Sequence, residues 1–340
     1  NINFFKTLLI SLIIILTFSV LPNLISFIKN EFKSNEVVLN SSKQNFDETL
    51  DKQKKNNKIL DDSVKDRFSW NIFEDIDVFG KNEDEENPQR LSASTIEELF
   101  NDNGYNLEIV KETKLVNAGN QLTRLPKELK NIESPKKRKE LFIKIVLPLI
   151  IEENLKIRFD RKKLFEILNK SNTTKRDKAW LDLKLKQYGV KNNDLAKLKI
   201  RMDEIPVSLA IAQAAKETGW GSSRFAQEGN ALFGQWTWSG EGIRPLEVEK
   251  NEKHKVAKFK ILKASVRAYQ RNLNTHSSYK EFRIERAIQR DNNQKLNSLK
   301  LVIFLEKYAE TGKEYTEVLK KIIIQNNLND FDDVEILPTS

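Results

Sequence analysis

The sequence contains no cysteine and only two histidines in 340 residues. The absence of cysteine excludes cysteine nucleophiles, thiolate metal sites, disulfides and a lipid-modified cysteine. With His254 and His276 alone, a zinc site would need carboxylate ligands, and a serine–histidine triad would have little choice of base. Carboxylates are therefore the acid–base groups that remain, and the sequence predicts neither a cofactor nor a bound metal.

The charge balance is basic, because 58 lysines and arginines face 49 aspartates and glutamates, a net charge of +9. Such a charge suits a polyanionic partner such as nucleic acid, an anionic membrane or cell wall. We expect the excess to be spread along the chain, so it favours none of these partners. A set of six basic residues is spaced as on one side of a helix and is expected to form a solvated face. These residues are Arg267, Arg271, Lys280, Arg283, Arg286 and Arg290.

Residues 1–30 are expected to be a transmembrane anchor or a signal segment. No charged residue lies between Lys6 and Lys29, and about 20 apolar residues suffice to cross a bilayer. Residues 17–19 weakly resemble a cleavage site, which leaves a cleaved signal peptide as the alternative. We prefer the uncleaved anchor because apolar residues continue beyond Ser19. The protein is therefore expected at the cell envelope, anchored in the cytoplasmic membrane with its bulk outside (periplasmic), or secreted if the segment is cleaved.

The rest of the chain divides by composition. Residues 31–93 are rich in charged and amide side chains and cannot bury enough apolar surface to fold, so they predict a disordered charged stalk. Helical patterns dominate residues 94–200, which predict a helical N-terminal region. Residues 201–330 carry the chemical motif described below, and residues 331–340 are expected to be a tail. The sequence thus predicts a mainly α protein.

The candidate catalytic residue is Glu217. An alanine-rich helix that starts at Pro206 is stopped by Gly219, which leaves Glu217 on the last turn beside Trp220. The carbonyl end of a helix and an apolar neighbour both raise the pKa of a carboxyl group, as a general acid requires. A solvated glutamate at a helix end is the simpler alternative.

The loop after this helix mixes aromatic and amide side chains, which suits stacking on sugar rings and hydrogen bonding to their acetamido groups. The same aromatics could form core. We expect Leu232 and Phe233 to pack in the core. For Trp236 and Trp238, packing in the core and stacking on the substrate are equally supported. The candidate substrate-binding residues are Trp220, Asn230, Phe233, Gln235, Trp236 and Trp238.

The run IPVSLAIAQAAKETGWGSSRFAQEGNALFGQWTW, residues 205–238, resembles the signature of bacterial endo-β-N-acetylglucosaminidases. These are the glucosaminidase domains of peptidoglycan hydrolases, glycoside hydrolase family 73, and the similarity is to their Bax-like branch. Residues 259–283 and 308–323 resemble later blocks of that branch. Together with segments ahead of the motif, the resemblance covers roughly residues 105–330.

The resemblance implies a mainly α (α+β), lysozyme-like fold with a small β element, in which residues 94–200 pack on a catalytic domain formed by 201–330. It also implies cleavage of the β-1,4 bond after N-acetylglucosamine, with Glu217 protonating the glycosidic oxygen. Tyr308 matches a tyrosine associated with the cleavage site, and its alternative is a hydroxyl satisfied by backbone. The second catalytic group stays open among the glutamates Glu241, Glu247, Glu249 and Glu252.

Two functions from different classes follow. The first is a peptidoglycan hydrolase whose partners are the glycan strands and, through the N-terminal helix, a membrane. The second is an inactive glycan-binding or scaffold protein of the same fold. The sequence favours the enzyme, because Glu217 and its glycine–tryptophan setting are intact. Nucleic acid is not an expected partner, since acidic residues accompany basic ones throughout, and no protein partner is named by the sequence.

Overall fold

The computed structural model describes residues 90–117, 122–237, 242–243 and 255–337. The expected anchor at 1–30 and all but the end of the expected stalk at 31–93 lie outside these residues. Within the described ranges, no helix combines the length and the apolar composition needed to cross a bilayer.

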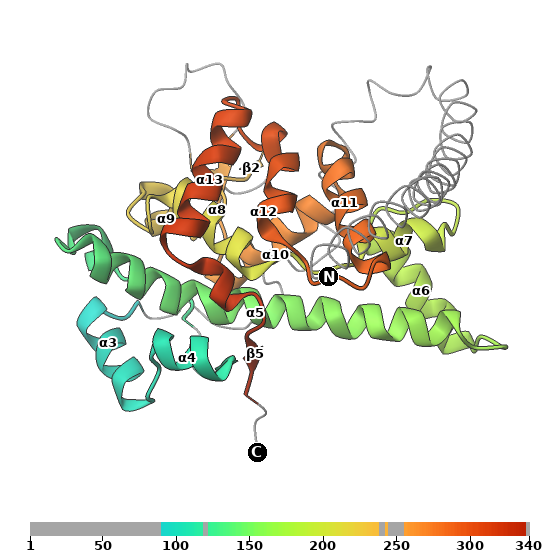
Figure 1. Ribbon diagram of the computed structural model, residues 1–340, viewed down its shortest axis with the longest axis horizontal. Helices are drawn as coiled ribbons and strands as arrows, with labels where there is room; N and C mark the ends of the chain where they lie inside the picture. The colour runs from blue at the N-terminus through green and yellow to red at the C-terminus, as the bar shows by residue number, and fades with distance from the viewer. Residues whose placement is uncertain (1–89, 118–121, 238–241, 244–254, 338–340) are drawn as a thin grey trace, which may run out of the picture. The chain divides into compact units, whose positions relative to one another are not determined.

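The described chain is mainly helical, as the sequence predicts, and fits the lysozyme-like class that the resemblance implies (Figure 1). Its α-helices are α3 (Ala93–Asp102), α4 (Leu107–Thr113), α5 (Pro135–Leu168), α6 (Lys175–Gln187), α7 (Leu195–Arg201), α8 (Val207–Thr218), α9 (Arg224–Gly229), α10 (Leu262–Thr275), α11 (Lys280–Asp291), α12 (Ser298–Leu301) and α13 (Lys313–Gln325). The 3-10 helices are η2 (Lys127–Asn131), η3 (Ser277–Tyr279), η4 (Val302–Tyr308) and η5 (Leu328–Phe331).

Strands are few and short in the described residues. Strands β2 (Trp236–Thr237), β4 (Lys255–Ala257) and β3 (Gly242–Ile243) form an antiparallel sheet in the order β2-β4-β3. This sheet is the expected small β element. Strands β1 (Leu115–Val116) and β5 (Glu335–Ile336) form a separate parallel pair that the sequence analysis did not anticipate.

Helix α5 runs without interruption although Pro148 lies in its interior. Proline has no N–H, so the carbonyl of Lys144, four residues earlier, loses its helical partner. The hydroxyl of Tyr105 donates to this carbonyl across 3.0 Å. The sequence predicts either a kink or a tightly packed exception at this proline. The structure has the second, with Pro148 buried inside a continuous helix.

One hydrophobic core joins helices on both sides of residue 200. It includes Phe100 of α3, Phe142 of α5, Leu209 of α8 and Leu319 of α13. Helix α5 contacts both α8 and α10, and it can be followed beneath them in Figure 1. The second half of α5 forms a smaller core with α6 and α7, made of Leu164, Leu185, Val190, Leu198 and Met202.

The end of the described chain is part of the fold, which corrects the expected tail at 331–340 for residues 331–337. Phe331 and Val334 are buried, and β5 pairs with β1. The carboxylate of Asp332 accepts hydrogen bonds from the backbone N–H and the hydroxyl of Ser208, each at 2.8 Å. Because helix N-termini leave N–H groups unsatisfied, Asp332 stabilises the start of α8.

The basic face predicted between Arg267 and Arg290 is also only partly solvated. Arg283 and Arg286 are 4% and 0% exposed. Arg286 donates to the carbonyls of Asp203 and Glu204 and lies 3.8 Å from the Asp203 carboxylate. Burial lowers the pKa of Arg286 to about 10. Arg286 therefore holds α11 against the segment between α7 and α8, whereas Arg283 donates to the carbonyls of Leu273 and His276 at the end of α10.

Gly221 provides a test of the packing between α5 and the turn after α8. Its φ is +81°, and an added Cβ would overlap the Leu129 methyl and lie 3.0 Å from Phe142 Cδ2. Gly104 has a similar φ of +63° but open space around the Cβ position. We expect Gly104→Ala to cost about 1–2 kcal/mol of unfolding free energy for its left-handed backbone. Gly221→Ala should cost about 1–3 kcal/mol more, because it also overpacks the core.

Urea denaturation of both variants measures this difference. Equal losses at the two positions would contradict the tight packing around Gly221.

Candidate active site

Glu217 lies on the last turn of α8, a helix buried along most of its length. Gly219 ends the helix in the left-handed conformation, with φ +56°. The hydroxyl of Thr218 donates to the carbonyl of Ala214 and accepts from the N–H of Gly221, which closes the helix end on itself. The position of the Glu217 carboxyl group is therefore fixed by the core and not by a free surface turn.

The backbone at Gly234 approaches this carboxyl group closely. A Cβ on Gly234 would lie 3.0 Å from Glu217 Oε2. The adjacent carbonyl of Phe233 accepts a hydrogen bond of 2.8 Å from the hydroxyl of Tyr308. Tyr308 therefore holds the Phe233–Gly234 backbone beside Glu217, and the missing side chain at Gly234 leaves Oε2 approachable.

The other carboxyl oxygen of Glu217 is held by a buried chain of hydrogen bonds. Tyr315 donates from its hydroxyl to Glu217 Oε1 across 2.9 Å. The Tyr315 hydroxyl accepts from Gln213 Nε2 at 3.0 Å, and Gln213 Oε1 accepts from the hydroxyl of Tyr269 at 2.7 Å. Because the Gln213 amide donates to Tyr315, the Tyr315 proton points toward Glu217.

The surroundings raise the pKa of Glu217 above its ordinary value of 4.5, chiefly because burial penalises the charged form. The hydrogen bond from Tyr315 and the charge of Lys216 oppose this shift without reversing it. The direction agrees with the sequence prediction. Burial also raises the pKa of Tyr315 and Tyr308, so both hydroxyls stay protonated near neutral pH.

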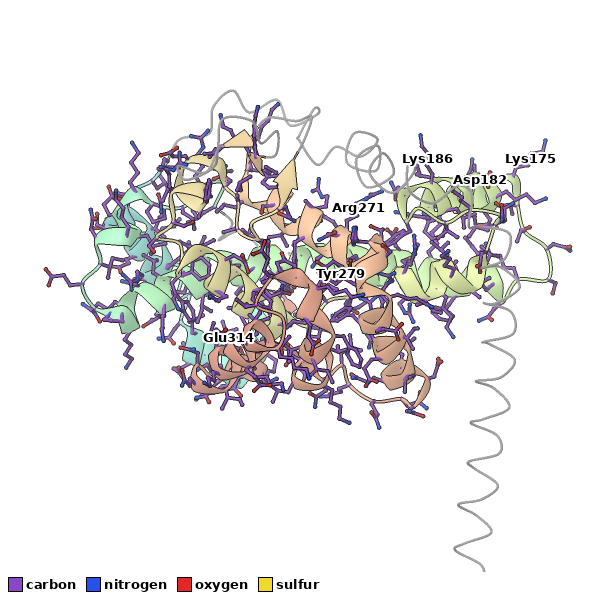
Figure 2. The ribbon with its side chains drawn as sticks, turned by 90° about the horizontal axis from the view of Figure 1, so that it is seen from above. Lys175, Asp182, Lys186, Arg271, Tyr279 and Glu314 are labelled. Carbon is purple, nitrogen blue, oxygen red and sulfur yellow. The ribbon has the colours of Figure 1, made fainter. Side chains whose placement is uncertain are left out.

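Aromatic rings enclose the hydrogen-bonded chain. The rings of Tyr308 and Tyr315 stack with centroids 5.6 Å apart, and Phe233 stacks on Tyr269 at 3.9 Å. Tyr279 extends the cluster, 6.0 Å from Tyr308, and can be found among the helices in Figure 2. The cluster excludes water from one side of Glu217, which accounts for the burial that shifts its pKa.

Two predicted substrate-binding side chains prove to be structural. Phe233 is 1% exposed and stacks on Tyr269, as the core interpretation expected. Asn230 is 4% exposed, and its amide nitrogen donates to the carbonyls of Phe259 and Lys260. Phe233 therefore packs in the core, and Asn230 holds the loop through its amide nitrogen, while its buried Oδ1 has no hydrogen-bond partner among the described residues. A substrate contact for either side chain stays a prediction.

Trp220 is half-buried and its described contacts are with α5. It packs edge to face on Phe142, with centroids 5.9 Å apart, and the ammonium of Lys139 lies 5.0 Å from the indole centroid. The Tyr308 hydroxyl is satisfied by backbone, the second of the two interpretations above. A direct part for either side chain in substrate binding or cleavage stays a prediction.

Gln235 stays a predicted substrate contact. Both polar atoms of its side chain are buried and have no hydrogen-bond partner among the described residues. Buried amides normally have partners, so this one can serve a bound ligand. The backbone of Trp236 pairs with Val256, while its side chain and all of Trp238 lie outside the described residues.

The four candidates for the second catalytic group, Glu241, Glu247, Glu249 and Glu252, also lie outside the described residues. Within the described part of the chain, no group of three or more His, Asp or Glu side chains is arranged to hold a metal ion. Sequence reasoning missed Gln213, Tyr269 and Tyr315. The spacing of Gln213, one helical turn before Glu217, was a signal that could have identified it.

The raised pKa of Glu217 gives a stability test. The folded state binds this proton more tightly than the unfolded state, so the cost of ionised Glu217 is absent below about pH 4.5 and grows as pH rises through the folded pKa. Glu217→Gln removes this cost and can still accept from Tyr315. We expect its melting temperature to exceed that of the wild type at neutral pH, with the difference shrinking toward pH 4. A wild-type advantage at neutral pH would contradict the burial penalty.

Comparison of the sequence with known proteins identifies the family of this chain. The family described as mannosyl-glycoprotein endo-beta-N-acetylglucosaminidase (Glucosaminidase) matches residues 193–328. Protein bax of Escherichia coli (strain K12) is 32% identical over 198 residues, which is 56% of this chain and 71% of that protein. No solved structure matches. With Glu217 in the matched region, the chain belongs to the glucosaminidase family, glycoside hydrolase family 73, in its Bax-like branch.

Proposed function

We propose that the protein is an endo-β-N-acetylglucosaminidase that cleaves the β-1,4 bond after N-acetylglucosamine in peptidoglycan, with Glu217 as general acid. The observation that carries the proposal is the unequal treatment of the two Glu217 oxygens. Oε1 accepts from Tyr315, whereas Oε2 faces the bare backbone of Gly234. This arrangement suits a carboxyl group that delivers one proton in one direction.

The proton of Glu217 resides on Oε2. Oε1 accepts the hydrogen bond from Tyr315, and the carbonyl oxygen of a neutral carboxyl group is a better acceptor than its hydroxyl oxygen, so this bond favours the proton on Oε2. A glycosidic oxygen beside Gly234 can take the proton from Oε2 as the bond to the sugar breaks through an oxocarbenium-like transition state. The raised pKa keeps the acid loaded at a higher pH than an ordinary glutamate would allow.

Substrate recognition is assigned to the loop that contains Gln235. An acetamido group offers both a donor and an acceptor, which match the two unpartnered side-chain atoms of Gln235. Trp236 and Trp238 are proposed to stack on sugar rings. The family description names a glycoprotein glycan, and the feature it shares with peptidoglycan is the β-linked N-acetylglucosamine.

Peptidoglycan is preferred as the substrate because the uncharged run between Lys6 and Lys29 favours export to the envelope. In that setting the N-terminal segment anchors the chain in the cytoplasmic membrane with the catalytic region outside. The Gln235 loop and Glu217 would then contact the glycan strands of the cell wall.

Replacing the proposed acid is the most direct functional test. Glu217→Gln keeps the shape of the side chain but cannot deliver a proton, so we expect glycan cleavage to fall by about 10²- to 10⁴-fold. Mass spectrometry of muropeptides released from purified peptidoglycan measures the loss and identifies the sugar at the new reducing end. Residual activity within about tenfold of the wild type would remove Glu217 from the role of acid.

The same digestion tests the alternative of an inactive glycan-binding protein. A wild-type protein that binds glycan strands but releases no fragments would favour that alternative.

The hydrogen bond from Tyr315 makes a prediction about pH dependence. This bond lowers the pKa of Glu217, so Tyr315→Phe should raise that pKa further. Activity that needs protonated Glu217 falls as pH rises through its pKa, and the alkaline side of the kcat/KM profile should therefore move to higher pH in the variant. Tyr308→Phe is the matched control, because the Tyr308 hydroxyl donates to Phe233 and not to Glu217.

We expect the control to keep the wild-type pH profile even if its activity falls. Identical profiles for Tyr315→Phe and the wild type would contradict the assignment of Glu217 as the acid under the influence of Tyr315.

A further inference from the structure

The basic charge of the protein is concentrated in one part of the fold. Between Lys156 and Arg201 the chain has 15 lysines and arginines but only 5 aspartates and glutamates. This excess of ten matches almost the whole net charge of +9, so the rest of the chain is nearly neutral. The expectation of an even spread is therefore wrong. We call the segment 156–201, which comprises the second half of α5 with α6 and α7, the basic arm.

Many of these positive charges face solvent without an acidic partner. Lys162, Lys175, Arg176 and Lys178 are exposed and form no ion pair with any described residue. Figure 2 shows Lys175 and Lys186 of α6 pointing away from the neighbouring helices, with Asp182 between them. Such a surface produces a positive potential that extends about 10 Å into solution at moderate salt.

The arm is rigid enough to present this charge as a fixed surface. Its own core packs α5, α6 and α7 together around Leu164, Leu185 and Leu198. The nearby positive charges are close enough to affect one another: besides burial, Arg201 lowers the pKa of Lys197. Repulsion between these positive charges destabilises the folded state, and binding of an anionic partner would reduce this repulsion.

Large apolar side chains lie exposed on the same arm. Phe159 of α5 is 63% exposed, the most exposed large apolar residue in the described part of the chain, and Leu183 of α6 is 51% exposed. Their chain neighbours Asp160 and Lys184 form an ion pair that joins the two helices. Phe159 and Leu183 therefore lie on adjacent helices of the arm, each next in sequence to one residue of this ion pair.

Two lysines lie on the same side of α5 as the exposed phenylalanine, as does Glu166 one further turn along. Lys162 and Lys163 follow Phe159 by three and four residues, so they share its side of α5. The ammonium of Lys163 lies 4.8 Å from the ring centroid of Trp180, which connects this side of α5 to α6. The result is a surface over two helices in which lysines border apolar groups.

We propose that the basic arm binds the surface of a bilayer that contains anionic phospholipids. Lysines attract the negative headgroups, and Phe159 and Leu183 enter the boundary between headgroups and acyl chains. A nucleic acid or a carboxylate-bearing glycan would attract the lysines but offers no apolar layer for these side chains. The uncharged run between Lys6 and Lys29, expected to hold the chain at a membrane, favours the same partner. The proposal does not rest on the glycosidase activity.

Vesicle cosedimentation tests the proposal. The protein used is a fragment that begins at Ser69, the boundary of the compact unit that contains all described residues, so the N-terminal apolar run is absent. We expect it to sediment with phosphatidylcholine vesicles that contain about 30% phosphatidylglycerol and to stay in solution with phosphatidylcholine alone. Binding should be lost at about 0.5 M salt, where screening shortens the reach of charge to a few ångströms.

The arm variant combines Lys162→Gln, Lys175→Gln, Arg176→Gln and Lys178→Gln. Each charge near an anionic surface contributes to binding, so removing four should weaken vesicle affinity by about tenfold or more. The matched control replaces four exposed lysines outside the arm, Lys127, Lys130, Lys136 and Lys137, with glutamine. It has the same net charge as the arm variant and should bind like the wild type. Circular dichroism confirms that both variants are folded.

A third variant, Phe159→Ser, tests the apolar contribution and should weaken binding to anionic vesicles without changing its salt dependence. Glu217→Gln should bind vesicles like the wild type, which separates this proposal from the enzymatic one. Equal binding to neutral and anionic vesicles, or equal losses in the arm variant and its charge-matched control, would overturn the proposal. So would sedimentation with purified peptidoglycan or retention by nucleic acid in the absence of vesicle binding.

Discussion

The hydrogen bond between Tyr315 and Glu217 is the interaction on which the candidate site depends. It joins α13 to the end of α8 and occupies one of two carboxyl oxygens, while the other lies beside the backbone of Gly234. Gln213 and Tyr269 set the direction of this bond. Tyr269 donates to Gln213 Oε1 and Gln213 Nε2 donates to the Tyr315 hydroxyl, so the Tyr315 proton is directed at Glu217. Burial raises the pKa of Glu217, while the hydrogen bond that orients its carboxyl group opposes this shift without reversing it.

Helix α8 links this site to the remainder of the domain. Asp332 stabilises the beginning of the helix from the far end of the chain, while the turn after it packs on α5 through Gly221. Helix α5 continues from there into the basic arm, and Arg286 of α11 donates to the carbonyls of Ile200 and Arg201 at the end of that arm. One buried framework thus supports both the carboxyl group that we propose as the acid of sugar cleavage and the lysine-rich face that we propose to bind anionic lipid.

The sequence located Glu217 because its determinants are local: a helix rich in alanine, a glycine stop and a tryptophan. Tyr315 could not be found in this way, since it lies 98 residues later and reaches Glu217 only through the packing of α13 on α8. The hydrogen-bond partners of Asn230 and the ring that stacks on Phe233 could not be predicted, because a side chain's type does not reveal which carbonyl or ring will cover it. The basic arm is not apparent from the net charge of the whole chain. Its positive excess becomes visible only when charges are counted over residues 156–201 alone. Helices were predicted well where hydrophobic periodicity and prolines marked their starts.

The protonation of Glu217 in the folded protein tests the central claim most directly. Carbon-13 NMR of protein labelled at the glutamate carboxyl carbons follows each titration, and the resonance missing from Glu217→Gln identifies the residue. We expect a titration midpoint above the ordinary value of 4.5 for Glu217, and a still higher midpoint in Tyr315→Phe. A midpoint at or below 4.5, unchanged by loss of the Tyr315 hydroxyl, would contradict a buried acid held by that hydrogen bond.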